Sequence, residues 1–95
     1  MHDRELLQWA AKAAKDFCPE ELVADWNPLV DDAQAFRLMT RLRIYLTFPD
    51  FEACGDEVYA KCPEASGVVA EEPLTPDGYR RSVVRLAAEI GKRRT

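Results

Sequence analysis

The spacing of the apolar residues changes twice along this chain, and these changes limit the folds it can adopt. Up to residue 42 apolar side chains recur at the period of a helix, from residue 44 they alternate as in a strand, and after residue 75 the helical period returns. Prolines separate the segments, because the residue before a proline disfavours helical geometry. The sequence therefore predicts helices at both ends of one domain, with strands between them.

Two helices are expected before the strands. The first spans residues 3–17 and ends before Pro19. Its apolar stripe consists of Leu6, Ala10, Ala13 and Phe17, with Trp9 beside it. The second begins near Asp31 or Asp32, since either carboxylate can accept backbone N–H bonds as an N-cap. Its apolar seam consists of Ala35, Leu38, Met39 and Leu42, and its solvated side of Gln34, Arg37 and Arg41.

Short strands are predicted over residues 44–48, 57–62 and 67–71. The loops between them are short, which favours antiparallel neighbours because a parallel pair needs a longer crossover. The predicted fold class is α+β, with three helices packed on a small, mainly antiparallel sheet of about three strands. One domain spans residues 1–95 and ends in a short basic tail at residues 92–95.

The closing helix has clear signals at both ends. Thr75 is a suitable N-cap, Pro76 suits the first helical position, and Asp77 complements the positive helix end. Its buried stripe is expected to contain Tyr79, Val83, Leu86, Ala87 and Ile90. Gly91 is interpreted as the C-terminal stop.

Composition indicates the compartment. No apolar run approaches the roughly 20 residues that span a bilayer, and the polar start is unlike a signal peptide. We therefore expect a cytoplasmic protein without a membrane partner. Cys18, Cys54 and Cys62 are expected to be thiols in that reducing compartment, with a Cys54–Cys62 disulfide as the alternative.

Residue sets that support catalysis or metal binding are missing from the sequence pattern. The single histidine, His2, stands next to the start of the chain, and the cysteines lack the close spacing of zinc ligands. The four glycines are scattered, so no phosphate-cradling loop is indicated. We expect no catalytic residue, no cofactor and no metal site. A small-molecule binder or an enzyme with residues converging from distant positions stays an alternative.

Charge is unevenly distributed along the chain. Residues 49–74 carry seven acidic residues against Lys61 alone, whereas the last segment is basic. Acidic surfaces can engage basic partners, and tryptophan is enriched at interfaces. The predicted protein-binding residues are Trp26, Asp50, Glu52, Asp56, Glu57, Glu71 and Glu72. Trp26 has the alternative interpretation of an anchor that holds the linker on the core.

A nucleic-acid partner is the second hypothesis. Its phosphate contacts would come from the closing helix and tail, through Arg81, Arg85, Lys92, Arg93 and Arg94. We expect Asp77–Arg81 and Arg85–Glu89 pairs to neutralise part of this stripe. The sequence pI near 5.0 also opposes a general nucleic-acid binder.

Two segments resemble a known family. Residues 25–38 (DWNPLVDDAQAFRL) and 79–91 (YRRSVVRLAAEIG) are similar to the small α/β/α-sandwich proteins of tailed phages and prophages. The resemblance implies an N-terminal amphipathic helix, an aspartate-capped second helix, a small sheet and a closing helix. It also implies a phage or prophage accessory protein in a bacterial cytoplasm. Our hypothesis for such a non-enzymatic protein with an acidic sheet region is that it binds a host or defence factor. The family has no assigned activity, so the resemblance assigns no catalytic residues.

Overall fold

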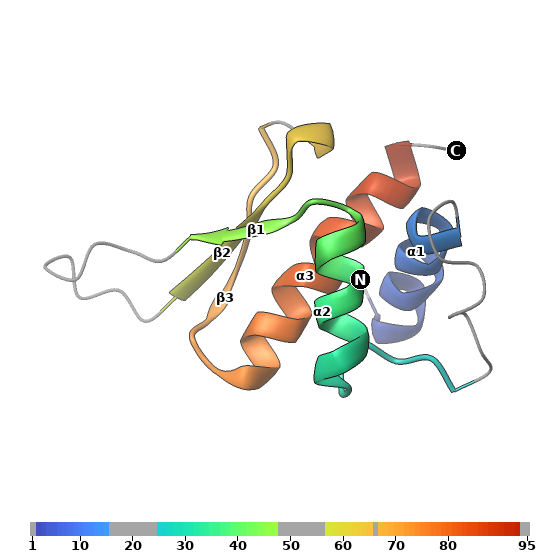
Figure 1. Cartoon of the computed structure of the whole chain (residues 1–95), viewed down its shortest axis with the longest axis horizontal. Helices are drawn as coiled ribbons and strands as arrows, with labels where there is room; N and C mark the ends of the chain where they lie inside the picture. The colour runs from blue at the N-terminus through green and yellow to red at the C-terminus, as the bar shows by residue number, and fades with distance from the viewer. Residues whose placement is uncertain (1, 16–24, 48–56, 66, 94–95) are drawn as a thin grey trace, which may run out of the picture.

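The structure is a computed structural model that describes residues 2–15, 25–47, 57–65 and 67–93. These residues form three α-helices, one 3₁₀ helix and three strands. In chain order they are α1 (Asp3–Lys15), α2 (Asp32–Arg41), β1 (Tyr45–Thr47), β2 (Glu57–Lys61), η3 (Pro63–Ala65), β3 (Ala70–Pro73) and α3 (Pro76–Arg93). The predicted α+β class and the order of helices and strands are confirmed (Figure 1).

The strands form one antiparallel sheet in the order β1-β2-β3. Tyr59 in the central strand lies opposite Thr47 on one side and Glu71 on the other. Lys61 lies opposite Tyr45. The predicted antiparallel pairing is therefore confirmed for the described strands.

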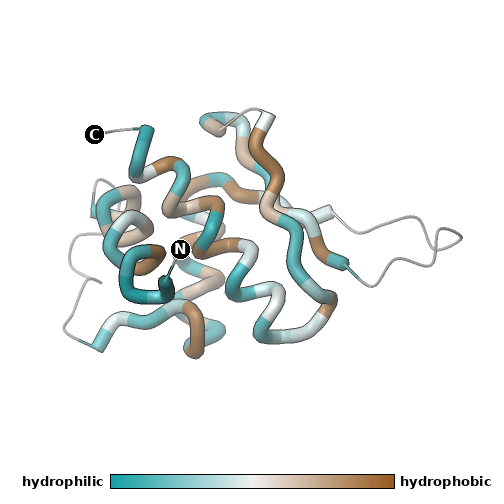
Figure 2. Tube along the Cα trace, turned by 180° about the vertical axis from the view of Figure 1, so that it is seen from behind, coloured by the Kyte–Doolittle hydropathy of each residue, from teal (hydrophilic) through white to brown (hydrophobic). Residues whose placement is uncertain are grey.

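Helix α3 is the centre of the fold. It packs on β2 and β3, on α1 and on α2, and it lies between the sheet and α1 (Figure 1). The predicted stripe is largely buried, but Ser82, Val84, Ala88 and Gly91 are buried as well. A helix that is buried on most sides, rather than along one stripe, is typical of a core position. Figure 2 shows that hydrophilic and hydrophobic residues alternate along the helices, as expected for elements with a buried face and an exposed face.

Gly91 has a different role from the one predicted. Helix α3 continues past it to Arg93, so the predicted stop at Gly91 is wrong. A Cβ atom at this position would lie 2.0 Å from the backbone carbonyl oxygen of Trp9 in α1. The glycine is therefore explained by the close approach of the two helices.

The helix starts follow the predicted capping. Asp31 is the N-cap of α2, and its carboxylate accepts a hydrogen bond from the Gln34 backbone N–H at 2.9 Å. The Gln34 side chain accepts in turn from the Asn27 backbone N–H at 2.7 Å. Thr75 caps α3 by accepting from the Gly78 N–H at 2.9 Å. Asn27 and Asp31, which precede α2, thus form a capping structure at its start.

Because of the way α2 ends, the first strand begins later in the sequence than predicted. The Arg43 N–H donates to the Thr40 carbonyl and the Ile44 N–H to the Met39 carbonyl, which together form a Schellman motif. Arg43 has a φ of 58°, in the left-handed region where glycine is the usual residue. Because Ile44 belongs to this cap, β1 begins at Tyr45 instead of residue 44.

The third strand is shifted from its predicted position. Residues 67–71 were expected, but β3 spans Ala70–Pro73. The helix η3 and a turn come first, with Gly67 at a φ of 89° and the Val68 N–H bonded to the Ala65 carbonyl. Local hydrogen bonding of the backbone in this turn explains the later start.

Cys62 is a buried free thiol that donates to the Leu42 carbonyl oxygen at 3.1 Å. It therefore forms no disulfide in this structure, and Cys54 lies outside the described residues. Among the described helices, none has the length and apolar character needed to cross a membrane.

Candidate protein-binding surface

The two faces of the sheet differ in character. Val58, Ala60 and Ala70 point inward and are buried against the helices. The alternate positions of each strand point outward, and no described helix lies over them (Figure 1). We call this set the open sheet face, and it consists of Tyr45, Thr47, Glu57, Tyr59, Lys61, Glu71 and Pro73.

Two tyrosines lie next to each other on the open sheet face. Tyr45 of β1 lies opposite Lys61 of β2. Tyr59 is two residues from Lys61 in β2, so the two tyrosines are diagonal neighbours. Diagonal neighbours in a sheet are roughly 7–8 Å apart, within reach of aromatic side chains. Tyr45 is 51% exposed. The face thus presents aromatic surface to solvent.

Carboxylates surround one of these tyrosines. The pKa of Tyr59 is raised above its ordinary value. The main cause is partial burial, and the negative charges of Glu71 and Glu57 add to it. Glu57 and Glu71 also line a hollow of about 320 Å³ with Glu72 and Pro73. No ion pair involves Glu57 or Glu71 within the described part of the chain. This end of the sheet therefore combines an aromatic ring with unpaired negative charge.

The structure separates the acidic residues predicted as one interface. Glu71 points outward, whereas Glu72 pairs with Arg85 and has only 15% of its side chain exposed. Asp50, Glu52 and Asp56 lie outside the described residues. Of the predicted acids, Glu57 and Glu71 are the two that meet on the open sheet face.

Trp26 lies elsewhere, in the segment before α2. It is half-buried and packs against the hydrophobic core, which favours the interpretation as an anchor. Sequence reasoning had not singled out Tyr45 and Tyr59 as binding residues. Their signal was present, because strand alternation places them on the same face as Glu57 and Glu71.

The basic residues of α3 have partners other than those predicted. Arg81 pairs with Asp3 of α1 at 2.7 Å, in place of Asp77. Arg85 pairs with Glu72 and donates to the Glu71 carbonyl at 2.8 Å, in place of Glu89. The Nζ atom of Lys92 lies 3.7 Å from Oε1 of Glu89. Arg93 is the last residue of the described helix, and Arg94 lies outside the described residues. A phosphate group would have to compete with these ion pairs for Arg81 and Arg85.

Arg80 was not among the predicted binding residues and joins three parts of the fold. Its side chain is 12% exposed, and its Nε donates to the Leu29 carbonyl at 2.9 Å. It also pairs with Asp32 at 2.5 Å and with Asp77. Hydrogen bonding to Asp32 is the main reason that the pKa of Arg80 is raised. Arg80 thus ties α3 to the start of α2.

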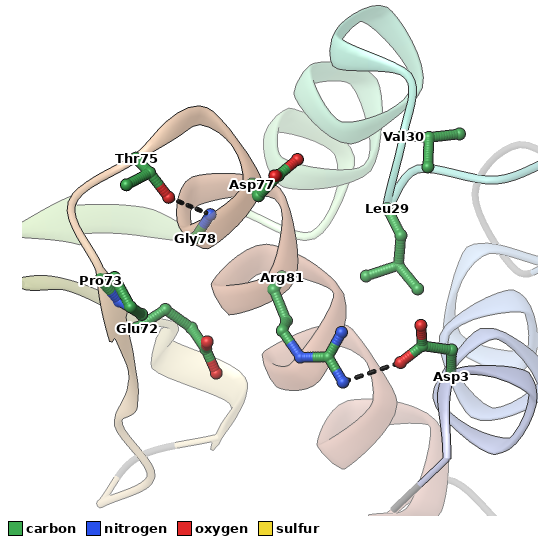
Figure 3. Close-up of a pocket in the computed structure, with 9 residues that line it drawn as sticks. All are labelled: Asp3, Leu29, Val30, Glu72, Pro73, Thr75, Asp77, Gly78 and Arg81. Atoms are coloured by element: carbon green, nitrogen blue, oxygen red, sulfur yellow. Dashed lines mark hydrogen bonds and ion pairs between the residues drawn. The ribbon is translucent and has the colours of Figure 1, made fainter.

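A groove of about 340 Å³ lies at the N-terminal end of α3 (Figure 3). Arg81 reaches across it to Asp3, and the Thr75 hydroxyl bonds the Gly78 N–H at one edge. Asp77, which also lines the groove, is paired with Arg80. Because these polar groups bind one another, the groove offers a ligand less than the open sheet face does.

Comparisons of the chain with models of protein families, with curated proteins and with solved structures found no match. The resemblance to the phage sandwich proteins therefore stays a prediction. Within the described residues, no group of three or more histidine, cysteine, aspartate or glutamate side chains is arranged to hold a metal ion.

Proposed function

We propose that this protein is a non-enzymatic binding module that holds a basic, arginine-bearing segment of another protein on the open sheet face. The observation that carries the proposal is the placement of Tyr59 directly opposite Glu71, with Glu57 two residues away on the same strand. An aromatic ring flanked by unpaired carboxylates suits a guanidinium group, which can stack on the ring while donating hydrogen bonds to the acids.

Charge favours a protein partner over a nucleic acid at this surface. The two carboxylates beside Tyr59 would repel phosphates, and two of the α3 residues that could attract them, Arg81 and Arg85, are already paired. Lys61, opposite Tyr45, limits the acidic area to one end of the sheet. Following the resemblance to phage proteins, we expect the natural partner to be a host or defence protein with a basic segment.

The test is binding of a short fluorescent polyarginine peptide, measured by anisotropy at low and at physiological salt. Glu71→Gln and Tyr59→Leu should each weaken binding about 2- to 5-fold, since an exposed ion pair and an exposed cation–π contact each contribute about 0.5–1 kcal/mol. The double variant should bind about 10-fold more weakly. A polyglutamate peptide should not bind.

The matched control is Glu5→Gln in α1, which removes the same charge from an exposed position away from the sheet. It should change the affinity less than about 2-fold, as expected for a distant charge that salt screens. If Glu5→Gln and Glu71→Gln weaken binding equally, only net charge attracts the peptide and the proposed surface is refuted.

A further inference from the structure

A second pocket lies away from the open sheet face, where the end of α2 meets the end of β2. Its volume is about 560 Å³, and it is lined by Thr40, Arg41, Leu42, Arg43, Cys62, Pro63 and Glu64. This volume falls in the range of about 300–1,000 Å³ that small-molecule sites occupy. The lining residues combine apolar side chains with two arginines.

The two arginines share this pocket because of the backbone at residue 43. On a regular helix, side chains two positions apart do not face each other. Arg43 adopts a φ of 58°, which ends the helix and turns the chain. Arg41, in the last turn of α2, and Arg43, after the turn, therefore border the same cavity.

Arg41 and Arg43 differ from the arginines of α3 that form ion pairs. Arg80, Arg81 and Arg85 are each held by a carboxylate. Arg41 and Arg43 are exposed, and the described residues provide neither with an ion pair or a side-chain hydrogen bond. Glu64 is the acid that lines the pocket, and it has an interaction of its own.

We propose that this pocket binds the phosphate group of a small phosphorylated molecule, with Arg41 and Arg43 as the donors. Guanidinium forks match phosphate oxygens, and two of them can neutralise a dianion. Leu42 and Pro63 would contact the organic part of the ligand, since the cavity is much larger than a phosphate group alone. This site is independent of the proposed protein-binding function.

The experiment is a titration of the ¹⁵N-labelled protein followed by NMR, with phenyl phosphate, inorganic phosphate and phenol as probes. Phenyl phosphate should shift the amide signals of residues 40–44 and 62–64 and leave α1 unchanged. Arg41→Gln and Arg43→Gly should each weaken its binding about 10-fold or more, because each removes hydrogen bonds to a charged group. Phenol should cause no shifts in this region.

Arg43→Gly is a well-matched variant, because glycine suits the left-handed backbone and should leave the cap of α2 intact. Arg4→Gln, an exposed arginine of α1, is the control and should leave the affinity unchanged. Inorganic phosphate that binds as tightly as phenyl phosphate would still support a phosphate site, with the free ion as its ligand. Equal affinities in the wild type and both pocket variants would overturn the proposal and leave the arginines only the role of stabilising the helix end.

Discussion

Replacing Gly91 with alanine tests the packing of α1 on α3, because the backbone of α1 lies directly against this residue. The new Cβ atom would lie 2.0 Å from the Trp9 carbonyl oxygen and 2.9 Å from its carbonyl carbon. Both are backbone atoms and cannot move aside by a rotamer change. Helix α1 would have to move away by about 1 Å, since real Cβ contacts are rarely shorter than 3.0 Å.

The expected effect is a net loss of stability. Overpacking a filled core costs about 1–3 kcal/mol, and contact with rigid backbone places this case near the upper end. Alanine improves helix propensity over glycine by about 1 kcal/mol. Gly91→Ala should therefore lower the free energy of unfolding by about 2 kcal/mol.

Urea denaturation followed by circular dichroism measures this change, with the m value required to stay constant. Gln8→Gly, at an exposed site within α1, is the comparison and should cost about 0.5–1 kcal/mol through propensity alone. If Gly91→Ala is as stable as the wild type or more stable, the close approach of α1 and α3 is refuted.

Other changes test the remaining features. Arg43→Gly should raise the free energy of unfolding by about 0.5–1 kcal/mol in urea denaturation, because glycine avoids the left-handed penalty of a side chain but loses more backbone entropy. Arg80→Met should lower the urea midpoint by several times the shift caused by Arg4→Gln, since the Leu29 carbonyl loses its donor. Tyr59 should ionise above 10.0 in the folded protein, so its contribution to stability is complete below that pH and is lost as the pH rises through the raised pKa. Ultraviolet absorbance of tyrosinate should show Glu71→Gln moving that pKa back toward 10.0.

Features that depend on neighbours in sequence were predicted well. The N-caps at Asp31 and Thr75 were identified because their hydrogen bonds join residues three apart. Alternation also predicted which residues of β2 point inward. Gly91 was misinterpreted because a glycine near a helix end is usually a stop, whereas its reason here is contact with a helix far away in sequence.

The candidate surface could be predicted only in part. Alternation separates Glu71 from Glu72, but the ion pair of Glu72 with Arg85 depends on how β3 lies on α3. The pairing of Tyr59 with Glu71 depends on strand register, and the predicted third strand ended at residue 71 instead of Pro73. The pocket at Arg41 and Arg43 needs the turn at residue 43, which no glycine marks in the sequence.

The central position of α3 has a consequence for synthesis on the ribosome. Helices α1 and α2 and strands β2 and β3 are translated before α3, and all four pack against it. Until α3 has left the exit tunnel, the nascent chain exposes apolar surface of the kind that promotes aggregation and chaperone binding. The domain should therefore complete its folding late, in one step that follows the appearance of its last helix.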